Sequence, residues 1–407
     1  MRLIDRLAGI PLCALITPFV KLRDWWRQRR VSSDKPNRVL FIELSEMGSA
    51  ILADPAMRAA IDEGAEIYFL IFKSNAQSLD LLQTVPADRI LTIDAGGLVP
   101  LALDTWRCLR RIHKLKIDTV IDLELFSRFT ALLTGLSGAH RRVGYHNFHG
   151  EGLWRGGMLT HKVHYNPHIH ISKNFLSLIH ATFSNEPEIP FSKVRIDDTL
   201  TQLAQAQVPE ADQQAMRERI EQFASKQGIE FDFDKAPLIL LNVNASELLV
   251  QRRWSQIQFS RLADQLLERY TDAIILLTGS PQEFDYVSQV QLLSRNSRVL
   301  NFAGQVKFNE LTALYSIARV MVTNDSGPAH FASVTPLRTV VLFGPETPAL
   351  YGALGGRSRA ITAGLACSPC VSAANHRKTA CKDNVCMQAI QVHDVFEVTQ
   401  QQIEENA

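Results

Sequence analysis

The chain contains 407 residues, of which 46% are hydrophobic and 21% are charged. This balance is typical of a packed globular protein and excludes a disordered chain, and the length allows two domains of ordinary size. The 43 basic residues nearly balance the 42 acidic ones, which excludes the strong basic excess of a dedicated nucleic-acid-binding protein. Six cysteines in so long a chain also exclude a small disulfide-stabilised scaffold.

Residues 1–35 combine an apolar run with a basic run. Leu7 to Val20 is uncharged, but its 14 residues are fewer than the ~20 that a membrane-spanning helix needs. A tryptophan pair among basic residues follows: Lys21, Arg23, Trp25, Trp26, Arg27, Arg29 and Arg30. This composition suits the cytoplasmic headgroup layer of a membrane, so we expect an interfacial anchor. The alternative is a terminal helix packed on the protein's own surface. A secretory signal fits less well, because no small-residue cleavage site follows.

Residues 36–234 begin with alternating strand and helix patterns. Nearly continuous apolar runs, typical of strands buried on both faces, occupy 38–44, 66–72, 89–94 and 117–125. Strands that alternate with helical patterns predict βαβ units and an open parallel sheet. The alternation of strand and helix patterns ends after about residue 138, where a stretch rich in histidine, glycine and arginine begins.

The alternation restarts over residues 235–365. Apolar runs at 236–245, 273–280, 299–304, 319–326 and 338–345 predict a second parallel sheet. We therefore expect an α/β protein with two Rossmann-like domains facing a cleft, followed by a cysteine-rich segment and tail over residues 366–407. Ligands of such sheets bind beyond the carboxyl ends of the strands.

The stretch "VMVTNDSGPAHFA" marks one such strand end. A helix that begins near Pro328 would point free N–H groups and a positive dipole end at a ligand, and Gly327 would let that ligand approach the backbone. Together with Ser326, this arrangement predicts a site for a phosphate or diphosphate. Asp325 suits sugar or ribose hydroxyls, and His330 can donate to a phosphate oxygen. The structural alternative is an ordinary helix cap beside a buried histidine.

Three further strand ends in the same half support the ligand-binding interpretation. "LLTGSPQE" and "LFGPETP" place glycine, a polar residue and proline where a strand becomes a loop, and "NVNASELLVQRRW" brings Ser246, Arg252 and Arg253. An arginine beside a helix N-terminus could neutralise a leaving diphosphate without a metal. Each feature alone is explained by a turn, whereas four at one sheet edge predict a nucleotide-diphosphate pocket.

These motifs resemble glycosyltransferase family 9, the ADP-heptose:lipopolysaccharide heptosyltransferases and their relatives. The resemblance rests on "TNDSGPAHFA", "LFGPETP", "RRW" and "LLTGSPQE", and on "VLFIELSEMGSAILADPAMRAA" and "HRRVGY" in the first half. It implies a GT-B fold and an inverting transfer that needs no cofactor. By motif position it implies that Asp325, Ser326, Gly327 and His330 hold the donor sugar and diphosphate. Ser246, from the strand-end motif, is a further candidate for the donor site. By this resemblance Glu283 lies near the nucleoside, and Arg252 stands where the family uses a lysine.

The expected catalytic base departs from the family pattern. Relatives commonly carry an aspartate after the first glycine turn, but this chain has Ser49, and a serine cannot serve as the base at neutral pH. Inverting transfer needs a group that takes the proton of the acceptor hydroxyl. Glu46 is the better candidate because it lies at the predicted strand end, and Asp54 is the second. Each could equally be an ordinary surface charge.

The basic, histidine-rich stretch from His140 to Lys173 lies in the half where this family binds its acceptor. Arg141, Arg142 and Lys173 are the candidates to bind phosphates or acidic sugars of a lipid-linked glycan. His164 and His168 have the spacing of a helical metal-ligand pair, but Pro167 between them disfavours a helix. We therefore expect no catalytic metal there.

Four cysteines cluster near the C-terminus: Cys367, Cys370, Cys381 and Cys386. Their number allows a structural zinc site, although the second spacing is loose for one. Reduced, unligated thiols are the alternative, and disulfides are disfavoured in cytosol.

The resemblance therefore implies a glycosyltransferase at the cytoplasmic face of a bacterial inner membrane. Its expected substrates are a nucleotide-diphosphate sugar such as ADP-heptose and a lipid-linked saccharide such as the lipopolysaccharide core. We expect no nucleic acid partner. Two alternatives stay open: a GT-B nucleotide-sugar epimerase, and a non-catalytic sugar-nucleotide-binding protein of the same fold.

Overall fold

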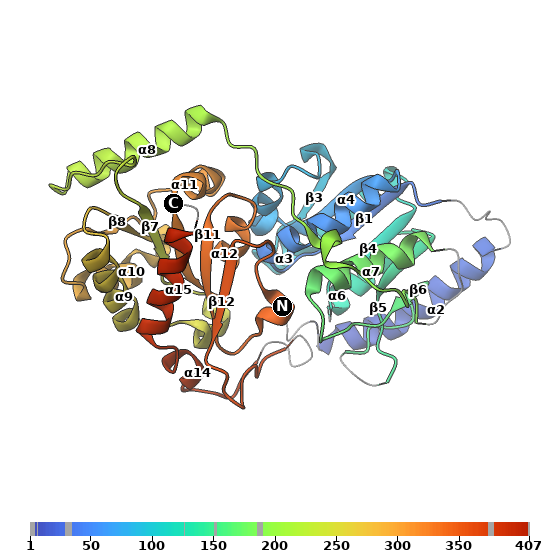
Figure 1. The fold of residues 1–407 in the computed structure, drawn as a ribbon. Coiled ribbons are helices and arrows are strands. Elements are labelled where there is room, and N and C mark those ends of the chain that lie inside the picture. The colour runs from blue at the N-terminus through green and yellow to red at the C-terminus, as the bar shows by residue number, and fades with distance from the viewer. Residues whose placement is uncertain are drawn as a thin grey trace. The chain divides into compact units, whose positions relative to one another are not determined.

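A computed structural model describes residues 5, 7–28, 35–125, 127–149, 153–184, 190–372 and 378–405. The described residues up to Gln202 form one compact unit, and those from Leu203 onward form a second (Figure 1). Each unit is built around a six-stranded sheet in which all neighbouring strands are parallel. The prediction of two parallel-sheet α/β domains is confirmed.

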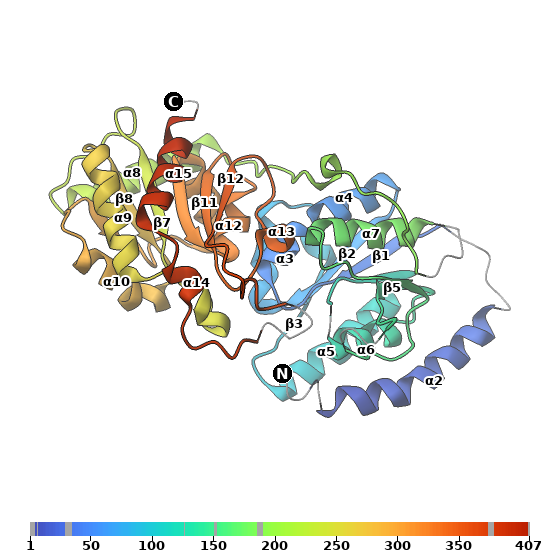
Figure 2. The ribbon, with the colours of Figure 1, turned by 60° about the horizontal axis from the view of Figure 1, so that its bottom comes forward.

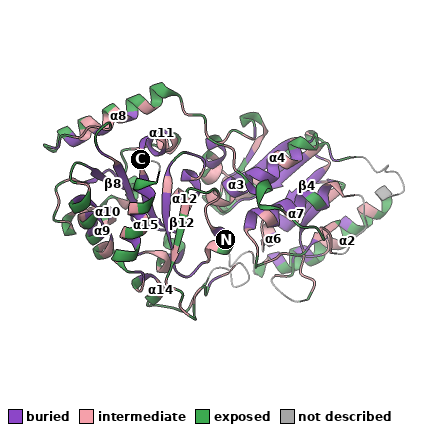
Figure 3. Ribbon diagram, viewed as in Figure 1, coloured by how far each residue is buried: buried purple, intermediate pink, exposed green. Residues whose placement is uncertain are grey.

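The first sheet has the strand order β3-β2-β1-β4-β5-β6. Its strands are β1 (Arg38–Ile42), β2 (Glu66–Phe72), β3 (Ile90–Ile93), β4 (Thr119–Asp122), β5 (Arg141–Tyr145) and β6 (His161–Val163). The central strands are buried along nearly their whole length, because helices cover both faces of the sheet. Figure 3 shows that the buried residues gather in the strands.

Helices of the first unit lie on the two sides of this sheet (Figure 2). On one side are α3 (Met47–Leu52), α4 (Asp54–Asp62) and α7 (Ile171–Phe183), and on the other are α5 (Leu98–Lys114), α6 (Arg128–Leu136) and α2 (Gly9–Gln28). Short 3₁₀ helices occupy Lys73–Leu81 (η1), Ala87–Arg89 (η2) and Asp198–Thr201 (η3).

The N-terminal helix α2 packs along α6. Its Cys13 and Val20 are buried against Ala131 and Met158. The described part of the chain contains no helix long and apolar enough to cross a membrane. Arg29 and Arg30 of the predicted basic run lie outside the described residues.

The second sheet has the order β12-β11-β10-β7-β8-β9. Its strands are β7 (Leu238–Asn242), β8 (Ile274–Thr278), β9 (Val299–Asn301), β10 (Val320–Asn324), β11 (Arg338–Phe343) and β12 (Ser358–Thr362). The α-helices of this unit are α8 (Glu210–Ser225), α9 (Gln256–Arg269), α10 (Phe284–Leu293), α11 (Leu311–Ile317), α12 (Gly327–Ala332), α13 (Pro348–Tyr351), α14 (Val385–Gln388) and α15 (Val392–Glu404). The 3₁₀ helices are η4 (Glu247–Arg252), η5 (Pro281–Glu283) and η6 (Phe308–Glu310).

The structure divides the chain earlier than the expected boundary at residue 234. Helix α8 belongs to the second unit, because its apolar side is buried there and Phe223 packs edge-on against Phe302 at 4.9 Å. The described residues 378–405 also join the second unit, because Val395 and Ile403 of α15 enter its core. Helix α8 is therefore not part of the first unit, and α15 is not part of a separate tail.

Candidate functional site

The centre of the second sheet contains a topological switch point. Strands β7 and β10 are neighbours, but the chain continues from β7 toward β8 on one side and from β10 toward β11 on the other. At such a point the loops after the two strands diverge and leave a crevice for a ligand. The loop after β7 leads to Arg252, and the loop after β10 contains Asp325 and Ser326.

Asn324, at the end of β10, holds these two loops together. Its buried amide oxygen accepts from Trp254 N at 2.9 Å, and its amide nitrogen donates to the carbonyls of Val243 and Asn244 at 3.1 and 3.3 Å. The sequence analysis gave Asn324 no role. The available signal was an amide side chain at the end of an otherwise apolar strand.

Arg252 and Asp325, predicted to share the site, are brought together. The guanidinium Nη1 lies 3.7 Å from Asp325 Oδ2, and both side chains are largely buried. Arg252 Nε is buried and has no hydrogen-bond partner among the described residues. A buried guanidinium donor without a partner favours binding of an anion.

Arg253, next in the sequence, has a different role. Its Nε and Nη2 donate to the carbonyl of Ala245 at 3.1 and 2.8 Å, and its guanidinium lies 5.0 Å from the ring centroid of Tyr286. Arg253 therefore fixes the shape of the loop, whereas Arg252 is directed to the end of β10.

Helix α12 begins directly beside this pair. Ser326 is its N-cap residue, and the Ser326 hydroxyl donates to the Asn324 carbonyl at 3.1 Å. A Cβ on Gly327 would lie 3.1 Å from the ring of Phe331, so this position favours glycine. His330 follows in the same short helix and is only 8% exposed.

The other two predicted donor-site residues have structural partners. Ser246 caps η4, because its hydroxyl accepts from Leu248 N at 3.2 Å. The Glu283 carboxylate accepts from Ser280 N at 2.7 Å and from the side-chain amide of Asn244. It thus joins the ends of β7 and β8, and its proximity to a nucleoside stays a prediction. Glu346, after β11, is a further buried carboxylate at this edge.

In the first unit, Glu46 and Asp54 lie in different environments. Glu46 is half-buried and is the N-cap residue of α3, at the carboxyl end of the sheet. Asp54 is fully buried; it forms an ion pair with Arg58 at 2.9 Å and accepts from Thr84 Oγ1 at 2.6 Å. Asp54 therefore stabilises the interior of the first unit. Glu46, at the carboxyl end of the sheet, is the better candidate of the two for the catalytic base.

A buried ion pair lies where β4 ends. Asp122 is fully buried and pairs with Arg155, which also donates to the carbonyls of Ser127 and Glu124 at 2.9 and 3.0 Å. Burial raises the pKa of Asp122 to about 6, while the positive charge of Arg155 opposes that rise. The pair fixes the loop that contains Arg155.

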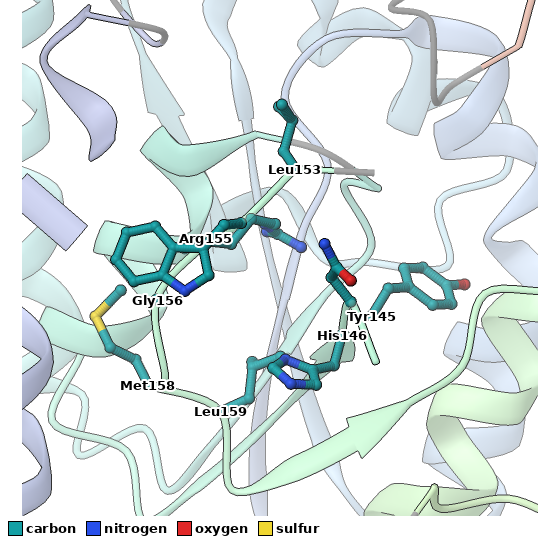
Figure 4. Close-up of a pocket in the computed structure, with 10 residues that line it drawn as sticks. Tyr145, His146, Leu153, Arg155, Gly156, Met158 and Leu159 are labelled. Atoms are coloured by element: carbon teal, nitrogen blue, oxygen red, sulfur yellow. The ribbon is translucent and has the colours of Figure 1, made fainter. Parts of the chain in front are cut away.

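This loop forms one wall of a pocket at the end of β5 (Figure 4). The pocket is open to solvent and is lined by Ala131, Tyr145, His146, Asn147, Leu153, Trp154, Arg155, Gly156, Met158 and Leu159. Burial and the nearby charges of Lys162 and Arg155 lower the pKa of His146, so its imidazole is neutral at pH 7. Most of these lining residues fall within the histidine-rich stretch from His140 to Lys173, but their meeting in one pocket could not be predicted from sequence.

The three residues predicted to bind the acceptor make contacts within their own unit. Arg142 is buried: Nε donates to Met158 O at 2.7 Å, Nη1 donates to Ala139 O at 2.5 Å, and Nη2 pairs with Asp24. Arg141 donates to the carbonyl of Thr182, and Lys173 pairs with Asp198 at 2.7 Å. Arg142 thus fastens α2 to the sheet, and the acceptor role of all three stays a prediction.

The four C-terminal cysteines are free thiols in the structure. Burial raises the pKa of the Cys386 thiol, and Cys370 and Cys381 add to that rise. Cys381 Sγ donates to the Asp383 carbonyl at 2.7 Å. Within the described ranges, no three histidine, cysteine or acidic side chains are arranged to hold a metal ion. A structural zinc involving Cys367 and these three stays a prediction.

Curated relatives of this chain are heptosyltransferases. It is 33% identical over 102 residues to lipooligosaccharide heptosyltransferase 2 of Haemophilus ducreyi, which covers 24% of this chain and 29% of the relative. It is 30% identical over 115 residues to lipopolysaccharide heptosyltransferase 2 of Salmonella typhimurium, with 27% and 32% covered. These alignments span about a third of each relative's length.

Solved structures match over nearly the whole chain. The ADP-heptose lps heptosyltransferase II of E. coli has a TM-score of 0.65 at 17% identity and covers 91% of this chain and 100% of its own. The glycosyl transferase family 9 structure from Veillonella parvula has a TM-score of 0.68 at 18% identity, with 91% and 98% covered. These likenesses show a shared GT-B fold.

The sequence profile of glycosyltransferase family 9 (heptosyltransferase) matches residues 105–380. This range contains the switch-point loops and the pocket at the end of β5. The chain belongs to glycosyltransferase family 9.

Proposed function

We propose that this protein is an inverting glycosyltransferase that moves a heptose from ADP-heptose onto a lipid-linked saccharide such as the lipopolysaccharide core. Family membership supports the transfer chemistry, and relatives that carry heptosyltransferase names support the sugar. The observation that carries the proposal is the pairing of Arg252 with Asp325 beside the first turn of α12, at the switch point of the second sheet.

The donor diphosphate binds between the start of α12 and Arg252. The Arg252 guanidinium neutralises the charge that develops on the leaving diphosphate, and the backbone N–H groups after Ser326 point at the same oxygens. Asp325 accepts from sugar hydroxyls, and His330 donates to a phosphate oxygen. Because these protein groups stabilise the leaving group, the reaction needs no metal ion.

Glu46 acts as the general base in the proposed reaction. It takes the proton of the acceptor hydroxyl while that oxygen forms a bond to the anomeric carbon, and the bond from this carbon to the diphosphate oxygen breaks. Attack opposite to the leaving group inverts the anomeric configuration. Glu46 thereby replaces the aspartate that relatives carry where this chain has Ser49.

The acceptor saccharide binds in the pocket at the end of β5. Trp154 is 45% exposed and offers an apolar ring face for a sugar, while His146 and Asn147 offer hydrogen-bonding groups. Arg155, whose charge is paired with Asp122, fixes the wall of this pocket.

Helix α2 holds the enzyme on the cytoplasmic face of the inner membrane. Opposite its buried residues it exposes an apolar arc that includes Leu15, Phe19 and Trp26, which are 62%, 67% and 63% exposed. A continuous apolar surface of this kind, next to basic residues, suits the lipid headgroup boundary.

The test measures ADP release by the purified full-length protein, with ADP-heptose as donor. Acceptor glycolipid extracted from cells that lack this protein is added to one half of the assays. Acceptor-dependent release supports the proposal. Turnover of donor alone indicates an epimerase or hydrolase, and ADP binding without turnover indicates a non-catalytic binding protein; either result contradicts it.

Two variants test whether Arg252 takes part in the reaction. Arg252→Ala should lower kcat by about 10²- to 10³-fold, as expected when one transition-state donor is removed. Arg269→Ala is the matched control, because Arg269 has a side chain 56% exposed and lies on α9. If both variants keep full activity, Arg252 does not stabilise the leaving group.

A further inference from the structure

Helix α5 presents an apolar stripe to solvent. Its buried residues, Cys108 and Ile112, face the sheet. On the opposite side, Val99, Leu103 and Trp106 are 69%, 48% and 56% exposed. Their spacing of four and three residues places them on one line along the helix. Three large apolar side chains in line are more than the scattered apolar residues of an ordinary surface.

Basic residues continue this stripe toward the end of α5. Arg110 extends the line, and its guanidinium lies 4.6 Å from the ring centroid of Trp106. Arg107, Arg111 and Lys114 are exposed beside it. The helix contains one acidic residue, Asp104, which pairs with Arg107 at 2.9 Å. The exposed surface of α5 is thus apolar at its start and positively charged at its end.

The side of the first sheet that carries α5 also carries α2 (Figure 2). Helix α6 connects the two: Phe129 and Leu133 of α6 pack in the same hydrophobic cluster as α5, and Ala131 packs against α2. The exposed apolar surfaces of α2 and α5 therefore belong to one side of the same unit.

We propose that α5 is a second membrane-contacting element, which inserts Val99, Leu103 and Trp106 at the headgroup boundary and binds anionic phospholipid through Arg110 and Lys114. The inference extends the membrane location proposed for α2. Charge selects the occupant: a negatively charged lipid surface complements the basic end of α5. A second copy of the chain, docked through the same face, would bring its arginines against one another.

Fluorescence quenching by brominated lipid tests the contact directly. The probe is full-length protein bound to vesicles of phosphatidylglycerol and phosphatidylethanolamine, with bromine on the acyl chains. In a Trp25→Phe, Trp26→Phe, Trp154→Phe variant, the remaining tryptophans are Trp106 and Trp254, and Trp254 is fully buried. We expect this variant to be quenched, and we expect the quenching to vanish on adding Trp106→Phe.

The outcomes separate this inference from the one about α2. Suppose that the variant that retains Trp106 is not quenched, whereas a Trp106→Phe variant that retains Trp25 and Trp26 is quenched. Then α2 touches lipid and α5 does not. If no variant is quenched, both membrane contacts are wrong. Concentration-dependent dimerisation lost on Leu103→Asp, without quenching, identifies a second copy as the partner and overturns the lipid proposal.

Vesicle sedimentation gives an independent measurement. The double variant Arg110→Glu, Lys114→Glu should bind anionic vesicles at least about tenfold more weakly, since each basic residue near such a surface contributes about a factor of five. Leu292→Asp is the matched control for Leu103→Asp, because Leu292 is 76% exposed on α10 of the second unit. Equal binding by all of these variants and the unmodified protein would overturn the proposal, provided that unfolding temperatures are unchanged.

Discussion

Polar residues at the carboxyl end of the second sheet differ in what their side chains do. Asn324, Glu283 and Arg253 use their polar atoms to tie neighbouring loops together. Arg252 and Asp325 instead meet each other beside α12, and Arg252 keeps a buried donor without a described partner. The first group shapes the site and the second provides its charges.

Replacing Asn324 by alanine should therefore affect both stability and ligand binding. The substitution leaves the groups that Asn324 satisfies without partners, at a cost of about 1 to 3 kcal/mol in the free energy of unfolding. It also releases the loop that carries Arg252, so ADP should bind at least about tenfold more weakly by calorimetry. Asn301→Ala is the control: Asn301 is also buried at a strand end, where it donates to Ser288 Oγ at 2.8 Å and to Phe284 O at 3.3 Å. It should lose similar stability and bind ADP normally.

Glu46→Gln tests the general base. Loss of the carboxylate should lower kcat by about 10²- to 10⁴-fold while the unfolding temperature stays constant, because Glu46 is only half-buried. Asp54→Asn should do the reverse and lower the unfolding temperature through the loss of a buried ion pair. Full activity of Glu46→Gln would assign the proton transfer to another group.

Among the elements, α2 has an exposed side and a buried side, and substitutions on the two sides should have different effects. Phe19 is 67% exposed, whereas its neighbour Val20 is 3% exposed and packs on α6. Phe19→Asp should weaken sedimentation with vesicles markedly and leave the unfolding temperature unchanged. Val20→Asp buries a charge and should lower that temperature markedly. Vesicle binding as strong as that of the unmodified protein in Phe19→Asp, in Leu15→Asp and in their combination would contradict the anchor.

The short strand β6 makes the first unit sensitive to acid. Burial, with Arg141 and Arg142 nearby, lowers the pKa of His161 to about 4 from an ordinary value near 6.5. The unfolded chain then binds more protons than the folded one between these two values, so stability rises with pH across that window and falls as pH drops through it. His161→Gln should flatten this part of a stability curve measured by chemical denaturation. An unchanged slope would mean that His161 titrates normally.

The strands could be predicted from sequence because their apolar runs are nearly continuous, and the strand-end motifs located the charges of the candidate site. Long-range contacts could not be predicted. Arg142 has the sequence context of a ligand-binding residue, yet Asp24, far away along the chain, holds it in the interior. Likewise, the apolar side of α8 shows that it needs a partner, but only the fold shows that this partner is in the second unit.

At the scale of the whole molecule, each unit has its own hydrophobic core and can respond separately to a ligand. ADP at about 100 times its Kd should stabilise the second unit by ~2.7 kcal/mol, which raises its unfolding temperature by about 5 to 10 °C. The transition of the first unit should not move. Calorimetry of the full chain with and without ADP measures this, and Arg252→Ala should remove the shift. An ADP-induced shift confined to the first unit would place the nucleotide site there.

The attachment of α2 also limits how far the enzyme can reach. Asp24 pairs with Arg142, Arg23 donates to the Gly135 carbonyl at 3.1 Å, and Asp5 accepts from the backbone N–H of Arg128 at 2.9 Å. These contacts join α2, and Asp5 before it, to helix α6 and strand β5, so the helix cannot behave as a flexible tether. On the membrane location proposed for α2, the pocket at the end of β5 would stand at one fixed height above the bilayer. We therefore expect acceptor length to matter as well as acceptor chemistry, because only a glycan whose hydroxyl projects to that height would reach the pocket.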